Sequence, residues 1–267
     1  MEDYFLDLDN VIKEAYEIAG KARKKGLDPE NSVNIPLATG IGKRVESLVS
    51  VEVGQVFDSG IAERIKELEV EYGILDWRIA LKIAEETLKG KFCSFKNEKE
   101  AMETAIRVGF AYLTLGVVSA PLEGFIELRT KNRGDGKKYL SVWYAGPIRG
   151  AGGTAAAFSV ILVDYVRKLK NYDVYDPTDL EIKRYVTELR DYHERVTNLQ
   201  YVPSEKEVEF LMERIPVEIN GDPTEKIEVS NYKDLSRVET NRIRGGVALV
   251  IAEGIAQKSG KLWKRLA

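Results

Sequence analysis

SVWYAGPIRGAGGT, residues 141–154, is the stretch that decides the fold. Its first half is rich in aromatic and β-branched residues, which favour a strand. Its second half is a loop that contains four glycines, and apolar residues then recur at helical spacing as far as Leu169. The sequence therefore predicts a strand, a glycine-rich loop and a helix over residues 139–170, with Thr154 as the cap of the helix.

The glycine-rich loop has two interpretations. Backbone N–H groups at the start of a helix attract anions, glycines let a phosphate group approach the backbone, and Arg149 could add a positive charge. The loop is not a Walker A sequence, however, and neither the acidic residue nor the second parallel strand of a dinucleotide-binding unit is evident at the right distance in the sequence. The alternative is a tight turn in which the glycines let helix and strand pack closely.

Two short strand pairs stand out from an otherwise helical pattern. They are residues 125–130 with 139–145, joined by the turn sequence NRGDG, and residues 216–219 with 226–229, joined by NGDP. Elsewhere, apolar residues follow a helical period, and Asp76 and Asn97 precede two of these stretches as caps. The expected fold class is α+β, predominantly α-helical with two small antiparallel β-hairpin elements.

The segment 28–60 has no sustained period and is punctuated by prolines and glycines, so we expect a long loop with one short helix near Lys43–Val49. An amphipathic helix precedes it from about Tyr4 to Lys25. The expected organisation is a helix and mobile arm or linker over residues 1–58, followed by a helical accessory domain with small β elements over residues 59–267.

A second basic motif, RVETNRIRGG, spans residues 237–246 and places three arginines in eight residues before two glycines. Arginine binds phosphate with two parallel hydrogen bonds, and a neighbouring asparagine can add a neutral contact. The alternative is a solvated or ion-paired loop in which Glu239 neutralises one arginine. The candidate DNA- or phosphate-binding residues are Arg149, Gly150, Gly152, Gly153, Thr154, Arg237, Asn241, Arg242 and Arg244.

Composition limits the function classes. The formal net charge of −3 argues against a dedicated nucleic-acid-binding domain, but a chain with this net charge can still carry a local basic patch. Cys93 and His193 are the only residues of their types, which excludes an internal disulfide and disfavours a zinc site. No apolar run reaches the length of a membrane span, and the N-terminus is acidic, so we expect a cytoplasmic protein without membrane contact. We expect no catalytic residue and no metal site in this chain.

Several runs resemble, in the same order, the N-terminal region of the large subunit of the archaeal family D DNA polymerases. They are RVESLV (44–49), GIAERI (60–65), SVWYAGPIRGAGGTAAAFSV (141–160), LQYVPSEKEVEF (199–210), VEINGDPTEKIEVSNYKDL (217–235) and RVETNRIRGGVALVIAEGIA (237–256). The similarity covers most of the chain. One departure is visible, because Gly150 stands where the family loop typically has serine.

The resemblance implies a non-catalytic accessory domain that supports subunit assembly and contacts DNA. It implies a longer parent subunit that performs template-directed DNA synthesis, with its catalytic aspartates and its magnesium and zinc sites outside these residues. It also implies three partners: DNA, the catalytic region of the same subunit, and a small subunit with 3′–5′ exonuclease activity. Two other functions stay open, a phosphate- or nucleotide-binding domain built on the glycine-rich loop and a purely structural scaffold.

Overall fold

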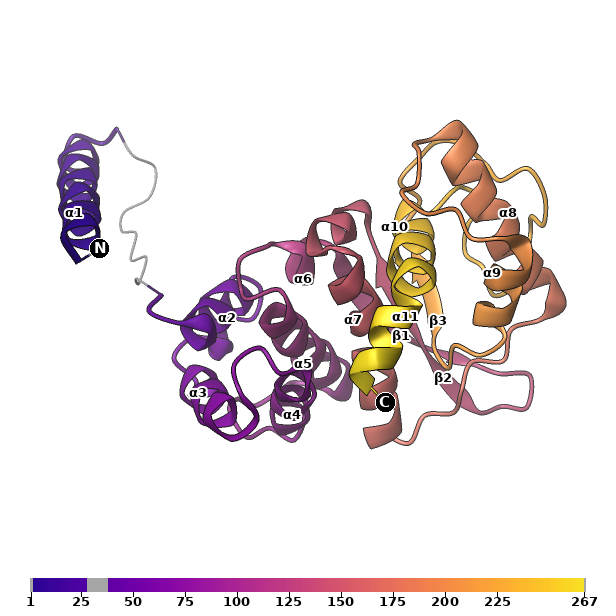
Figure 1. Ribbon diagram of the computed structural model, residues 1–267, viewed down its shortest axis with the longest axis horizontal. Coiled ribbons are helices and arrows are strands. Elements are labelled where there is room, and N and C mark those ends of the chain that lie inside the picture. Colours follow the sequence, from indigo (N-terminus) through magenta and orange to yellow (C-terminus); the bar gives the residue numbers. More distant parts are fainter. Residues whose placement is uncertain (1, 28–37, 267) are drawn as a thin grey trace. The chain divides into compact units, whose positions relative to one another are not determined.

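The computed structural model describes residues 2–27 and 38–266 of the chain (Figure 1). Internal contacts divide the chain into two units, Met1–Leu37 and Ala38–Ala267. The described part of the first unit is the helix α1 (Glu2–Lys24), which ends in a turn at Gly26 with a φ of 68°. Several large apolar side chains of α1 are exposed, among them Val11 and Ile18.

The expected boundary near residue 58 differs from the observed division after Leu37. The expected short helix near Lys43–Val49 is present as α2 (Ile41–Ser50), but it belongs to the second unit. Val45 and Val49, one turn apart, are fully buried against apolar residues of the following helices. Burial of such side chains stabilises the fold by about 1.5–3 kcal/mol each. Residues 41–58 therefore pack with the rest of the second unit. Residues 28–37 of the expected arm lie outside the described residues.

The second unit begins with helices. They are α2, the short 3₁₀ helix η1 (Gly54–Val56), α3 (Ile61–Tyr72), α4 (Trp77–Leu88), α5 (Glu98–Leu113) and α6 (Ala120–Glu123). Asp76 and Asn97 cap α4 and α5 as expected, because their side chains accept the backbone N–H groups of Arg78 and Glu100. Buried aliphatic residues of α2 to α5 form one cluster of the core.

The rest of the second unit surrounds a small sheet. Its elements are β1 (Phe125–Asn132), β2 (Lys138–Tyr144), the 3₁₀ helix η2 (Gly146–Ala151), α7 (Gly153–Leu169), α8 (Asp179–Arg195), α9 (Glu205–Met212), β3 (Glu218–Gly221), α10 (Gly245–Leu249), the π-helix η3 (Val250–Ala256) and α11 (Gln257–Leu266). Figure 1 shows α2 to α5 at one end of this unit, α8 and α9 at the other, and α7, α11 and the sheet between them.

The sheet confirms one expected strand pair and corrects the other. β1 and β2 form the antiparallel hairpin, with Thr130 opposite Leu140. β3, however, pairs in parallel with β2, with Ser141 beside Glu218, and residues 226–229 form no strand. A parallel pair needs a long crossover, and α7, α8 and α9 supply it. The fold is α+β and predominantly helical as expected, but residues 2–27 and 38–266 contain one three-stranded sheet in the order β1-β2-β3 instead of two hairpins.

Candidate nucleic-acid interface

The glycine-rich loop connects the end of β2 to the start of α7. Tyr144 ends the strand fully buried, and its hydroxyl lies 2.7 Å from the hydroxyl of Ser159 on α7. The loop folds as η2 and turns at Gly152, whose φ of 78° and ψ of 147° suit glycine but strain other residues. The expected cap is wrong, since α7 begins at Gly153, Gly152 occupies the cap position, and Thr154 lies inside the first turn.

The loop glycines have different surroundings. An ideal Cβ atom on Gly153 would lie 2.2 Å from the carbonyl oxygen of Glu253, so this glycine lets α7 contact η3 through the backbone. No atom would lie within 4 Å of a Cβ atom on Gly150 or Gly152. The close-packing interpretation therefore holds for Gly153, whereas the backbone at Gly150 and Gly152 borders open space.

Arg149 is held by an ion pair inside the protein. Its Nη2 atom donates to Oε1 of Glu253 over 2.8 Å, and the same oxygen accepts the backbone N–H of Gln200 over 2.9 Å. Glu253 is buried and lies in the π-helix η3, a rare geometry that often marks functional sites. Arg149 thus holds the glycine-rich loop against η3, and Glu253 already neutralises its charge.

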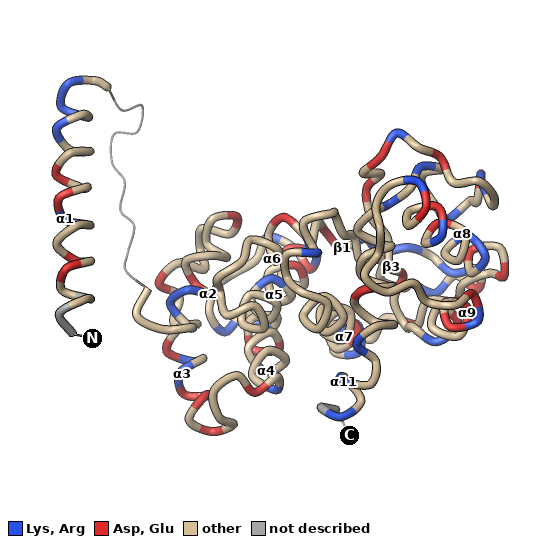
Figure 2. Tube along the Cα trace, turned by 45° about the horizontal axis from the view of Figure 1, so that its top comes forward, with Lys and Arg blue, Asp and Glu red and all other residues tan. Residues whose placement is uncertain are grey.

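A cavity of about 430 Å³ opens at the start of α7. Gly152, Gly153 and Thr154 line it, together with Lys258 and Lys261 from α11. The first backbone N–H groups of a helix have no partner within the helix and carry partial positive charge, so they attract anions together with the two ammonium groups. Acidic and basic residues mix over most of the second unit, but the last turns of α11 are basic (Figure 2).

Sequence reasoning missed Lys258 and Lys261. Their spacing of three residues places both on one face of a helix, which is the one signal that the sequence offers. Nothing local shows that this face returns to the start of α7. The contact between α11 and α7 is made by the fold, since the two helices lie about 100 residues apart along the chain.

The second basic motif is largely built into the protein. Arg237 donates to both carboxylate oxygens of Glu181, over 2.9 and 2.6 Å, and to Asp176 over 2.8 Å. Arg244 is fully buried, donates to Glu188 over 2.7 Å and to Asn220 over 2.7 Å. Both arginines are therefore ion-paired within the protein, which was the alternative to phosphate binding. Their acidic partners lie on α8 or just before it, and neither arginine pairs with Glu239, the expected partner. Glu239 instead pairs with Lys131.

Asn241 and Arg242 differ in their exposure. The side chain of Asn241 exchanges hydrogen bonds with Asp234, donating to its carboxylate and accepting its backbone N–H, each over 2.8 Å. Arg242 is exposed, and its carbonyl oxygen accepts a hydrogen bond from Arg184. The backbone therefore fixes the position of Arg242 while its side chain faces solvent, which leaves this residue available to a phosphate group.

The buried carboxylate of Glu188 joins two arginines. Oε2 of Glu188 lies 3.3 Å from Nε of Arg184 and 2.7 Å from Nη2 of Arg244. Burial alone would raise the pKa of Glu188, but the charges and hydrogen bonds of the two arginines outweigh it, and the pKa lies below its usual range. Arg184 also donates to three carbonyl oxygens of the segment 232–242. The triad thus anchors the second basic motif to α8.

The two basic motifs meet at the end of β2. An ideal Cβ atom on Gly246 would lie 2.5 Å from the carbonyl oxygen of Tyr144, so α10 approaches the start of the glycine-rich loop through the backbone.

Within residues 2–27 and 38–266, no group of three or more histidine, cysteine, aspartate or glutamate side chains is arranged to hold a metal ion. In the same part of the chain, no helix is both long and apolar enough to cross a membrane.

Comparison with known proteins assigns the family. The family model described as DNA polymerase II large subunit DP2, N-terminal, matches residues 3–267. The DNA polymerase II large subunit of Nanoarchaeum equitans is 53% identical over 263 residues, which are 98% of this chain and 21% of that protein. The large subunits of Archaeoglobus fulgidus and Pyrococcus furiosus are 48% and 46% identical over 98% and 99% of this chain. The chain spans about a fifth of the length of these relatives. It belongs to the family of N-terminal regions of the archaeal DNA polymerase II large subunit.

Proposed function

We propose that this chain is the N-terminal accessory domain of the large subunit of an archaeal replicative DNA polymerase and that it contacts the DNA backbone. The single observation that carries the DNA contact is the cavity where the start of α7 faces Lys258 and Lys261. Backbone N–H groups, a helix dipole and two ammonium groups suit a phosphate oxygen and carry no base specificity. The exposed Arg242 offers a further phosphate contact.

The rest of the polymerase belongs to the same proposal. The parent subunit performs template-directed DNA synthesis, and its partner is a small subunit with 3′–5′ exonuclease activity. Magnesium and zinc are held by parts of the parent subunit outside this chain. The buried carboxylates described above support a structural role for this domain, since Glu188 and Glu253 are each engaged by arginine. A reading frame that continues past Ala267 in the gene is the first expectation to check.

DNA binding by the 267-residue chain tests the proposed contact. Replacing Lys258 and Lys261 together by alanine is expected to weaken binding to duplex DNA and to flatten its salt dependence. Each lost phosphate contact changes the slope of log K against log[salt] by about 0.9, so the double variant should lose about 1.8 from the slope. Fluorescence anisotropy of a labelled duplex, titrated at several salt concentrations, measures both the affinity and the slope.

Two single substitutions complete this experiment. Lys206→Ala removes an exposed lysine of α9 that does not line the cavity, so affinity and slope should stay close to those of the unmodified chain. Arg242→Ala should lower the slope by about 0.9. If the double lysine variant binds DNA as the unmodified chain does, the cavity makes no phosphate contact and the structural-scaffold function gains support. Binding of ATP that requires both lysines, without binding of DNA, would instead favour the nucleotide-binding function.

A further inference from the structure

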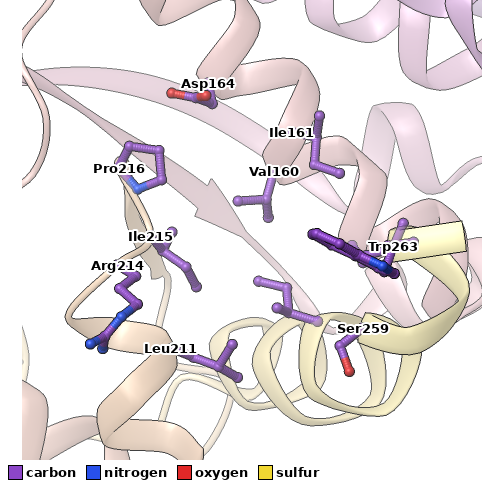
Figure 3. Close-up of a pocket in the computed structure, with 12 residues that line it drawn as sticks. Val160, Ile161, Asp164, Leu211, Arg214, Ile215, Pro216, Ser259 and Trp263 are labelled. Carbon is purple, nitrogen blue, oxygen red and sulfur yellow. The ribbon is translucent and has the colours of Figure 1, made fainter. Parts of the chain in front are cut away.

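A second cavity, of about 530 Å³, opens on a different side of α7 (Figure 3). It lies between α7, α11 and the connection from α9 to β3, and its walls are mostly aliphatic and aromatic. The main apolar residues that line it are Val160, Ile161, Leu211, Ile215, Leu262 and Trp263. Its volume lies in the range of ligand pockets, and an open apolar surface of this kind marks an interaction site.

The polar residues at its edge are already engaged. Asp164 accepts a hydrogen bond from Arg167 and pairs with Lys168, and the guanidinium of Arg214 pairs with Glu213 over 2.6 Å. The charges of Asp164 and Arg214 are therefore compensated by neighbouring side chains of opposite sign. Trp263, by contrast, keeps 74% of its surface exposed while its ring borders the cavity (Figure 3). An occupant would be recognised by apolar side chains that cover this ring.

The position of the cavity indicates which occupant reaches it first. Leu262 and Trp263 line it and lie within five residues of the end of the matched region at residue 267. In the relatives this N-terminal region is about a fifth of the subunit, so most of the polypeptide is additional to it. A segment tethered beside a site reaches millimolar effective concentration, far above that of a separate protein.

We propose that this cavity docks an apolar segment of the same large subunit that follows residue 267. This inference rests on the proposed function, because it takes the chain to be the N-terminal part of a longer polymerase subunit. The docked segment covers Trp263 and fills the space between Val160 and Leu211. It thereby fixes α11, and with it Lys258 and Lys261, against the start of α7.

Site-directed photo-crosslinking in the full-length subunit, purified with its small subunit, tests this assignment. Ser259 lines the cavity and is exposed, so Ser259→Cys places a benzophenone maleimide at its edge once Cys93 and the other accessible cysteines of the full-length complex have been replaced by serine. The expected cross-linked peptides come from residues of the large subunit beyond 267. Val70→Cys serves as the matched control, because Val70 is 84% exposed on α3 and does not line the cavity.

Three results would overturn the assignment. Cross-links to residues 1–267 of a second copy would show a dimer contact, cross-links to the small subunit would show an interface between subunits, and a yield no higher than that of the Val70→Cys control would show an empty cavity. Hydrogen exchange gives an independent reading. Amides of residues 211–215 should exchange at least tenfold more slowly in the full-length subunit than in the 267-residue chain, and equal rates would also overturn the assignment.

The docking experiment and the DNA-binding experiment fail separately. Lys258 and Lys261 line the first cavity only, and Ser259 lines the second only. Loss of the expected salt effect with retained cross-links would remove the DNA contact and keep the docking site. The reverse result would keep the DNA contact and remove the docking site.

Discussion

Replacing Glu188 by glutamine is expected to lower the free energy of unfolding by about 3–5 kcal/mol, the usual cost of breaking a buried ion pair. Glu188 and Arg244 are fully buried, and Arg184 is buried to the same degree. Glutamine keeps an oxygen that can accept a hydrogen bond but removes the negative charge, which leaves two guanidinium groups facing each other without compensation. Urea denaturation followed by circular dichroism measures the change.

Glu194 provides the matched control for this substitution. It lies on the same helix α8, and its side chain is exposed. Glu194→Gln should therefore change the free energy of unfolding by less than about 0.5 kcal/mol. A loss below 1 kcal/mol for Glu188→Gln would contradict the view that the triad holds the second basic motif in place.

The same carboxylate predicts how stability depends on pH. The pKa of Glu188 is lower in the folded chain than its usual value, because Arg244 and Arg184 outweigh the effect of burial. A carboxylate with a lowered pKa stabilises the folded state fully above its unfolded pKa, and this contribution is lost as the pH falls through the folded pKa. The unmodified chain should therefore lose stability below the usual glutamate range, near pH 4.5. Glu188→Gln should show a flatter pH dependence there, and parallel profiles would contradict the assignment.

Replacing Gly153 by alanine is expected to cost about 3 kcal/mol, the upper part of the range for overpacking. The added Cβ atom would lie 2.2 Å from the carbonyl oxygen of Glu253, and this oxygen belongs to the backbone, which yields less readily than a side chain. The substitution would push α7 and η3 apart. We therefore expect weaker DNA binding as well, because the first cavity loses its shape. Urea denaturation and the anisotropy titration measure the two effects.

Gly150→Ala is the control in the same loop. Nothing lies within 4 Å of the added Cβ atom, and Gly150 is not among the residues with positive φ. A compatible glycine-to-alanine change stabilises a protein by about 0.4–1 kcal/mol, because it restricts the unfolded chain. Opposite signs for the two substitutions would support the division of the loop into a packed and an open part. Equal losses would show that the loop tolerates no side chain at either position.

Local patterns in the sequence were sufficient for the helices and for one hairpin. Apolar residues at helical spacing located α3, α4 and α5, and Asp76 and Asn97 marked where two of them begin. A turn sequence between two β-rich runs located β1 and β2. Each of these signals acts over fewer than about 20 residues. The same kind of signal was misleading at Asn220-Gly221, where β3 pairs with β2 instead of a neighbouring strand.

The candidate site could be predicted only in part. The glycine-rich loop was found from its composition, and Gly152 and Gly153 do lie at the start of a helix beside a cavity, but DNA contact there stays a prediction. The role of the second motif could not be inferred, because arginines that bind phosphate and arginines that form internal ion pairs have the same local sequence. Arg244 meets Glu188, a residue 56 positions away, and this distance hides the pairing from any local pattern.

The sequence by itself determined the family, the predominantly helical α+β class, and the strand, glycine-rich loop and helix over residues 139–170. The tertiary structure alone decided that β3 runs parallel to β2, that Arg149, Arg237 and Arg244 pair with buried or partly buried carboxylates, and that Lys258 and Lys261 face the loop. The physical reason is that helices and tight turns depend on neighbouring residues, whereas a buried charge is stable only beside a partner that folding brings to it.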